Sequence, residues 1–250
     1  MGTPVKQLPA WLLAGLSCAI PHCALAWGTL LLIDPAPAQD TLSVGASVWS
    51  MPKSPEATHQ TTTLTPALDY ARHDGWFVST EMGVGFNASH TETWQAGVRL
   101  WPQFGRSQQD VTPYAAHLGP RLQKQIFANH MLGDIAMVQS ALSYGSGHDQ
   151  RGMQSELGVV SGIPWSGGML GLGVAATFGN RTYRRDYTGL NSSGWSDWSW
   201  TASLEHRFNA NWHVDAQYQQ ASVKINPLLV STGTHAHPQT LLLTLWRDIH

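Results

Sequence analysis

The chain has 250 residues, a formal net charge of −2, only 12% charged residues, 24 glycines and 12 tryptophans. Its near-neutral charge gives no reason to expect a nucleic-acid partner. Its charged fraction is well below the roughly 25% of an ordinary soluble domain, which argues against a freely soluble protein.

The N-terminus carries the pattern of an export signal. A lysine precedes an apolar stretch at 8–20, and small residues follow at 24–26. This order predicts a secretory signal peptide at 1–26, with cleavage after Ala38 as the alternative. Both cysteines of the chain lie in this segment, so the exported domain, 39–250, cannot form a disulfide.

Apolar residues alternate with small or polar residues in segments from residue 41 onwards. Successive side chains of a strand point to opposite faces, so each segment has one apolar and one small or polar face. In the clearest segment, 168–180, leucine, valine, alanine and phenylalanine alternate with glycine, alanine and threonine. We expect strands at 41–50, 60–71, 75–88, 92–102, 119–128, 133–145, 151–163, 168–180, 195–208, 212–223 and 239–247.

Two architectures fit this alternation: a membrane β-barrel with its apolar face in lipid, and a soluble β-sandwich with that face in a core. A bilayer admits only helices and closed barrels, because every backbone group must be paired internally. The longest nearly apolar run, 24–33, is far shorter than the roughly 20 residues of a spanning helix. Low charge, glycines for crowded inward positions and tryptophans for interfacial girdles favour an all-β, transmembrane, antiparallel up-and-down β-barrel.

The strand count indicates one further strand that crosses the membrane. The segments above number eleven, whereas single-chain bacterial barrels have an even number of strands. Short turns, expected at the periplasmic end, are 129–132, 164–167 and 209–211. Long links, expected outside, are 51–59, 146–150, 181–194 and 224–238. Assignments from the two ends of the chain collide at 103–118, so we expect a further crossing near 111–117 and twelve strands, with ten as the alternative.

Charged residues also fall on the predicted inner face. They are Glu81, Arg99, Glu156, Glu205, Arg207 and Asp215. Opposite charges on neighbouring strands can satisfy one another and plug a narrow barrel. They can also line a small selective pore. A wide porin channel is not expected, because side chains fill most of the lumen of a barrel of this size.

The densest cationic and aromatic patch lies in the predicted external loop after 168–180. Its residues are Arg181, Tyr183, Arg184, Arg185 and Tyr187. Arginine and tyrosine are common anchors at protein interfaces. At a barrel rim they can equally meet lipopolysaccharide phosphates or the interfacial zone of the membrane.

The search for catalytic chemistry is mostly negative. Ser146, His148 and Asp149 have the residue types of a hydrolytic triad, but adjacent residues cannot orient one another in that geometry, and a turn is expected. His235 and His237 share a face of an extended loop without a nearby third ligand. We therefore expect no catalytic, metal or cofactor site.

The order of segments resembles the MipA/OmpV family of outer-membrane proteins, the MltA-interacting protein group. The segments that carry the resemblance are SVGA at 43–46, LTPALDY at 64–70, GVGFN at 83–87, AGVRL at 96–100, SYGSGHD at 143–149 and ELGVV at 156–160. One departure is the C-terminus, which ends on His250 where such barrels usually end on an aromatic residue.

The resemblance implies a non-enzymatic scaffold in the outer membrane that links a murein lytic transglycosylase and a bifunctional penicillin-binding protein in peptidoglycan processing. Outer-membrane lipid and lipopolysaccharide are its expected surroundings. The alternatives are a barrel for small-solute permeation and, less favoured, an outer-membrane barrel hydrolase.

Overall fold

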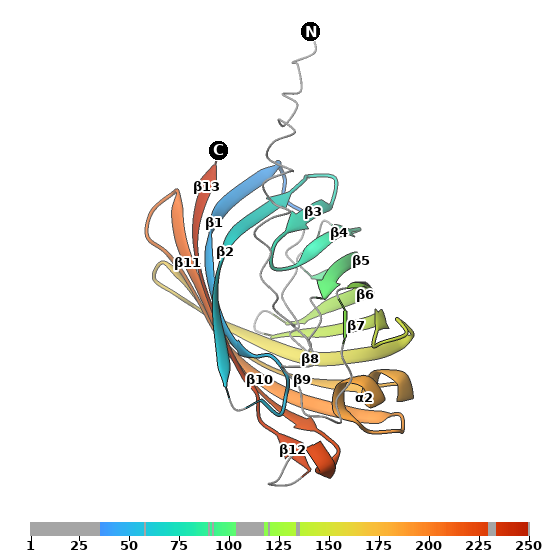
Figure 1. Cartoon of the computed structure of the whole chain (residues 1–250). Helices are drawn as coiled ribbons and strands as arrows, with labels where there is room; N and C mark the ends of the chain where they lie inside the picture. Colours follow the sequence, from blue (N-terminus) through green and yellow to red (C-terminus); the bar gives the residue numbers. More distant parts are fainter. Residues whose placement is uncertain are drawn as a thin grey trace.

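A computed structural model describes residues 36–57, 59–89, 91, 93–103, 118–119, 121–133, 136–229 and 234–249 (Figure 1). The predicted signal peptide lies outside these residues. Within them the chain is mostly β-strand. No helix in this part of the chain is long and apolar enough to cross a membrane.

The strands follow one another along the chain with few interruptions. They are β1 Thr41–Pro52, β2 Gln60–Ala71, β3 Trp76–Ser79, β4 Gly83–Asn87, β5 Trp94–Gln103, β6 Arg121–Leu132, β7 Ala136–Ser146, β8 Gly152–Trp165, β9 Gly168–Gly179, β10 Gly194–Arg207, β11 Trp212–Lys224, β12 His235–Ala236 and β13 Gln239–Ile249. Helix α2 (Arg181–Thr188) lies between β9 and β10, and the 3-10 helix η2 (Pro227–Leu229) follows β11.

The sheet closes on itself. Strand β1 pairs with β2 on one side and with the last strand, β13, on the other, so that Leu42 lies opposite both Tyr70 and Ile249. Each remaining strand pairs antiparallel with its neighbours around the ring. Leaving out the two-residue β12, the 13-stranded sheet of the described chain is a ring of twelve. The structure therefore confirms the predicted up-and-down barrel and its twelve strands, and excludes the β-sandwich.

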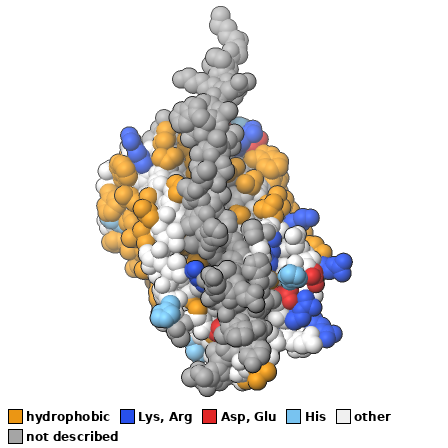
Figure 2. All heavy atoms as spheres, in the orientation of Figure 1, with side chains coloured by type: hydrophobic (Ala, Val, Ile, Leu, Met, Phe, Trp, Pro, Cys, Tyr) orange, Lys and Arg blue, Asp and Glu red, His pale blue; other side chains and the backbone are white. Residues whose placement is uncertain are grey.

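The alternation places apolar side chains on the outside of the ring. On β9, Leu172 is 62% exposed and Val174 58% exposed, while Thr177 between β8 and β10 is 1% exposed. A soluble protein would turn these leucines and valines into its core, whereas a membrane barrel presents them to lipid. Apolar side chains accordingly cover the flanks of the molecule in Figure 2.

Exposed aromatic side chains lie toward both ends of this apolar surface. Toward the end that carries Thr41 and Ile249 they are Trp76, Trp94, Trp165, Phe208 and Trp212. Toward the opposite end they are Tyr144, Phe178, Trp195 and Trp198. Two belts of this kind are typical of the interfacial girdles of outer-membrane barrels.

Connection lengths distinguish the two ends of the barrel. The connections 72–75, 166–167 and 208–211 are short and lie at the end with Thr41 and Ile249, whereas 180–193 and 225–238 are long and lie opposite. Short turns are periplasmic and long loops external in such barrels. We call the two ends periplasmic and outer accordingly. Strand β6 continues to Leu132, so the turn predicted at 129–132 was wrong.

The twelfth strand comes from a place that the sequence analysis did not anticipate. The segment 75–88, predicted as one strand, folds into the short hairpin β3–β4 with a turn at 80–82. The crossing predicted near 111–117 lies outside the described residues. Val78 pairs with Val84 across the hairpin, and both are exposed to the lipid side. The alternation is thus the same for a folded hairpin and for an unbroken strand, and it could not distinguish them.

Local interactions explain why the chain turns at 80–82. The Ser79 hydroxyl accepts hydrogen bonds from the backbone N–H groups of Glu81 and Met82, each at 3.2 Å. Gly83, which follows, has φ +83°, a conformation that favours glycine. Alternation along 75–88 predicts that Met82 faces lipid on the same side as Val84, but Met82 packs inward against Phe77 and its neighbours.

We expect the full chain in outer-membrane fractions to migrate faster on a gel when unboiled than when boiled. A closed barrel resists cold detergent because backbone hydrogen bonds join its strands into a ring. The measurement is the mobility difference between the two samples. Identical mobilities would contradict the closed ring.

Candidate functional site

The lumen is the first candidate site, and the internal turn, residues 80–82, crosses it. On one side, Glu81 Oε1 accepts hydrogen bonds from Thr244 Oγ1 on β13 at 2.6 Å and from Ser47 Oγ on β1 at 3.3 Å. On the other side, Met82 packs against a cluster formed by Phe77, Phe127 and Ala141 on β3, β6 and β7. The internal turn therefore joins opposite parts of the barrel wall through the interior.

The base of the internal turn is fixed to the wall. The Thr80 N–H group donates to the Leu68 carbonyl on β2 at 2.9 Å, and the Thr80 hydroxyl accepts from the Leu68 N–H at 3.1 Å. The Arg99 guanidinium on β5 reaches the Met82 carbonyl at 3.5 Å. Contacts to β1, β2, β5 and β13 thus fix the internal turn, with Thr80 exposed at the wall and the side chains of Glu81 and Met82 directed inward.

The predicted lumen charges occupy inward positions, but mostly without direct ion pairs. Arg99 and Glu156 are 7% and 6% exposed. Arg99 donates to the Gln125 side chain and Glu156 accepts from Gln154 Nε2 at 2.7 Å, so amides satisfy both groups. Gln125 Nε2 in turn donates a hydrogen bond to Ser143 Oγ at 2.8 Å. Amides and a hydroxyl therefore hold Arg99 and Glu156, which form no direct ion pair with each other among the described contacts.

The other three predicted charges lie on β10 and β11. Glu205 lies directly opposite Asp215 in the strand register, so two acidic groups are neighbours on one face. Asp215 accepts a hydrogen bond from Trp246 Nε1 at 2.9 Å. Arg207 forms an ion pair with Asp248 at 2.6 Å.

Sequence reasoning missed Asp248. It accepts from Ser43 Oγ at 2.7 Å and lies 3.5 Å from His213, in addition to its ion pair with Arg207. Asp248 lies on the same face of β13 as Thr244 and Trp246, whose side chains point inward. The predicted strand ended at 247, one residue short of it. An extended final strand would have placed Asp248 on the lumen face.

Helix α2 covers the outer mouth of the barrel. Asn180 caps its start by accepting the Tyr183 N–H at 2.9 Å, and Gly189 ends it with φ +69°. Tyr183 and Tyr187 are buried in a cluster at the mouth. The other members of this cluster are Leu118, Ala221, Val223, Ile225 and Ala236.

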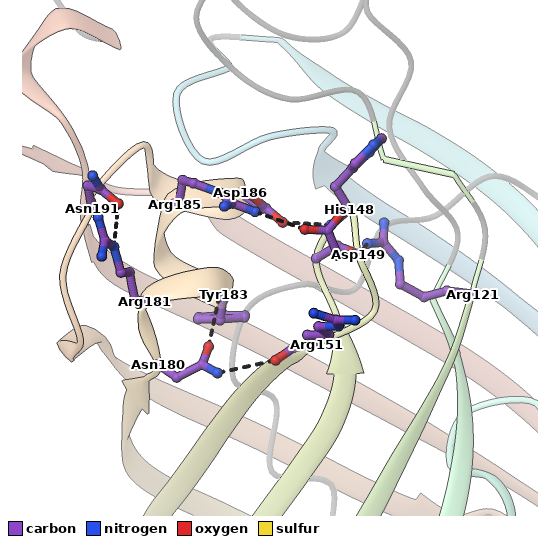
Figure 3. Close-up of polar contacts among 11 residues, drawn as sticks. Arg121, His148, Asp149, Arg151, Asn180, Arg181, Tyr183, Arg185, Asp186 and Asn191 are labelled. Carbon is purple, nitrogen blue, oxygen red and sulfur yellow. Dashed lines mark hydrogen bonds and ion pairs between the residues drawn. The ribbon is translucent and has the colours of Figure 1, made fainter.

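Polar contacts fasten this helix to the β7–β8 connection, as Figure 3 shows. The Asp186 carboxylate accepts the His148 N–H at 2.6 Å and Arg185 Nε at 2.7 Å. Arg185 also lies 3.4 Å from Asp149, and these two carboxylates raise the pKa of its guanidinium. Farther around the mouth, the Tyr187 hydroxyl donates to Gln103 Oε1 on β5 at 2.9 Å. These contacts fix the helix to the barrel at its outer mouth.

The predicted rim residues divide into two groups. Tyr183, Arg184 and Tyr187 are buried, whereas Arg181 and Arg185 are exposed. The segment is a helix and not the loop expected from sequence. Two signals could have identified it: the tyrosines four residues apart and the Asn and Gly at its two ends.

Ser146, His148 and Asp149 lie at the turn that receives α2, where the His148 N–H and the Asp149 carboxylate bind the helix. His235 lies on β12 beside Lys224. Among the described residues, no group of three His, Cys, Asp or Glu side chains is placed to hold a metal ion.

The periplasmic end carries a small exposed polar cluster. The carboxylate of Asp40 accepts the backbone N–H of His73 at 3.0 Å and lies 2.6 Å from the His73 ring nitrogen Nδ1. These contacts lower the pKa of Asp40 to about 2. Arg72 and Asp74 form an exposed ion pair at 2.8 Å in the same connection.

Comparisons with known proteins found one family model and several solved structures. The family model of the MltA-interacting protein MipA matches residues 44–226. Solved structures of similar shape include an outer membrane channel from Pseudomonas putida F1 (TM-score 0.48, 13% identity, 87% of this chain and 100% of that chain). The NanC porin (0.42, 8%, 84% and 99%) and the channel DcaP of Acinetobacter baumannii (0.39, 8%, 88% and 100%) are others. No curated protein sequence matches this chain.

We expect Glu81→Ala to raise single-channel conductance in planar bilayers above that of the unchanged protein. The substitution removes the hydrogen bonds to Thr244 and Ser47, each of the charge-assisted kind worth about 1.5–3 kcal/mol. The control is Glu205→Ala, which removes a lumen carboxylate that has no hydrogen bond across the described lumen. Equal increases in the two variants would show that charge, and not the internal turn, limits conductance.

We expect Gly179→Val to lower the unfolding free energy by about 1–3 kcal/mol, because it forces atoms into a filled space. A Cβ at Gly179 would lie 2.4 Å from Tyr183 Cδ1 and 2.8 Å from Ser196 Oγ. The measurement is the temperature at which the fast-migrating band disappears. Gly119→Val is the control, since nothing lies within 4 Å of its Cβ. Unchanged melting of the Gly179 variant would contradict the packing of α2 against β9.

Proposed function

The chain belongs to the MipA family of MltA-interacting proteins, and on this basis we propose that it is a non-enzymatic scaffold of the outer membrane. The family description names an interaction with MltA. We extend it to this chain as a scaffold that links a murein lytic transglycosylase and a bifunctional penicillin-binding protein. The role would be to hold peptidoglycan-processing enzymes at the inner surface of the outer membrane.

One observation carries this proposal: parts of the chain itself lie inside the barrel and at its outer mouth. The internal turn bridges the lumen through Glu81 and Met82, and α2 packs across the mouth through Tyr183 and Tyr187. A barrel built in this way offers its rims, and not its lumen, for interaction. Murein enzymes lie in the periplasm, so the periplasmic rim is the surface that they can reach.

The exposed periplasmic cluster supplies groups for such a contact. The side chains of Arg72, His73 and Asp74 are 45%, 61% and 40% exposed. The bonds from Asp40 hold His73 and its connection in one conformation. A preformed connection loses little conformational freedom on binding, which favours affinity.

Permeation of small solutes is the second candidate. The inward positions of Arg99, Glu156, Glu205 and Asp215 favour it, since such charges select ions in narrow pores. A hydrolase is the least favoured function, because Ser146, His148 and Asp149 serve the turn that binds α2. Export would use the signal peptide 1–26, with cleavage after Ala26 or Ala38.

We expect the detergent-solubilised full chain to retain a purified murein lytic transglycosylase on a pull-down, and Arg72→Glu to weaken the retention about tenfold or more through charge reversal at the periplasmic rim. Lys224→Glu, at the outer end of β11, is the matched control and should bind normally. Equal binding by Arg72→Glu would remove the periplasmic cluster from the contact. Absence of any retention, together with ion conductance by the unchanged barrel, would favour permeation over the scaffold.

A further inference from the structure

The outer rim presents a second surface, distinct from the periplasmic one. Lysine and arginine side chains gather on the lower right flank in Figure 2, where Figure 1 shows α2 and the outer ends of the strands. The exposed cations of this region are Lys124 on β6, Arg151 before β8, and Arg181 and Arg185 on α2. They come from three separate parts of the chain, and the fold brings them to one side of the barrel.

The strand register places Lys124 on the lipid-facing side. Its neighbours two residues away, Leu122 and Ile126, are 57% and 60% exposed. Across the sheet Lys124 lies opposite Tyr144, and Tyr144 lies opposite Met153; both are exposed. A cation therefore lies in a row of lipid-facing apolar and aromatic side chains, close to the outer ends of β6, β7 and β8.

Hydrogen bonds join this row to α2. The Met153 carbonyl accepts the Asn180 N–H at 2.9 Å, and the Arg151 carbonyl accepts Asn180 Nδ2 at 3.2 Å. Arg181 follows Asn180 directly, as Figure 3 shows. The guanidinium of Arg181 donates to the neutral side chain of Asn191, at 2.7 Å, and forms no ion pair with any described residue. The backbone at 151–153 and the start of α2 thus hold two arginines immediately above the lipid-facing row.

Three of these cations have no ion-pair partner among the described residues. Arg185 is paired with Asp186 and Asp149. None of the ion pairs of the described residues includes Lys124, Arg151 or Arg181. At the interface of a bilayer, uncompensated cations beside exposed aromatic and aliphatic side chains match a ligand that has anionic head groups and acyl chains.

We propose that Lys124, Arg151 and Arg181 form a binding site for the phosphates of the glycolipid of the outer leaflet, the lipid A part of lipopolysaccharide. The guanidinium groups of Arg151 and Arg181 bind phosphate oxygens through paired N–H groups. Lys124 binds a phosphate as a point charge, and the acyl chains pack against Tyr144, Met153 and Leu122. This site does not depend on the scaffold role, because it lies on the opposite rim.

The test uses the full chain, refolded in detergent, with native mass spectrometry to count bound lipid at increasing concentrations of lipid A. We expect Lys124→Gln/Arg151→Gln/Arg181→Gln to bind lipid A at least about tenfold more weakly than the unchanged protein. Arg247→Gln is the matched control: Arg247 is also a lipid-facing arginine, stacked 5.8 Å from Trp212, but lies near the periplasmic end. It should bind lipid A normally. A heat-modifiable band establishes that each variant is folded.

Two further arms identify the ligand. Dephosphorylated lipid A should bind the unchanged protein as weakly as intact lipid A binds the triple variant. Inorganic phosphate and phosphatidylglycerol should compete poorly, because neither offers two phosphates above several acyl chains. Equal binding of lipid A by the triple variant, or equal binding of dephosphorylated lipid A, would overturn the site. Equal binding of phosphatidylglycerol would replace it with a general affinity for anionic lipid.

Discussion

Backbone hydrogen bonding in a solvent without water is the constraint on which this structure depends. Each unpaired peptide group in hydrocarbon costs several kcal/mol, so a sheet that crosses the membrane must close. Closure here depends on the pairing of β1 with β13, whose register runs from Leu42 opposite Ile249 to Ser50 opposite Leu241. The lipid-facing leucines and valines follow from closure, because one face of every strand must point outward.

The short hairpin β3–β4 is where this constraint is met least completely. Strand β2 pairs with β3 only over Asp69–Ala71, so among the described residues its outer half has a strand partner on one side only. Pro66 lies in that half. Proline lacks an N–H group and is confined to strand edges, so its presence fits an edge and not a central position. Because β3 and β4 are short, the internal turn that joins them can bend toward the lumen. The missing strand partner of β2 and the internal turn therefore have one cause.

The sequence predicted the barrel well because its evidence was periodic. The alternation of apolar and polar residues does not depend on the conformation of the turns. The outward positions of Val98, Leu172 and Val174 follow directly from it. The same property hid the β3–β4 hairpin, because a turn of three residues preserves the parity of the flanking strands. Helix α2 was missed for another reason. A segment of eight residues between strands gives too short a pattern to compete with the expectation of a loop.

Candidate sites were harder to predict than the fold, because they depend on contacts between distant residues. Glu81 falls on the inward parity of the alternation, but no local pattern could show that it reaches Thr244, 163 residues away. The predicted patch at 181–187 treated Tyr183 and Tyr187 as surface anchors, and the fold uses them to close the mouth. Lys124 drew no attention alone, because its importance arises only when Arg151 and Arg181 are brought beside it.

The internal turn in the lumen and the helix at the outer mouth bear on where the function of this barrel can lie. The polar network around Arg99, Gln125 and Ser143 keeps interior groups satisfied, and the tyrosines of α2 seal the mouth with apolar contacts. What remains accessible is the two rims and the lipid-facing wall. The periplasmic rim carries Arg72, His73 and Asp74, a mixture of charges suited to a protein surface. The outer rim carries uncompensated cations beside lipid, suited to phosphates. The two surfaces face different chemistry, so a single rigid barrel can engage the periplasm and the outer leaflet at once.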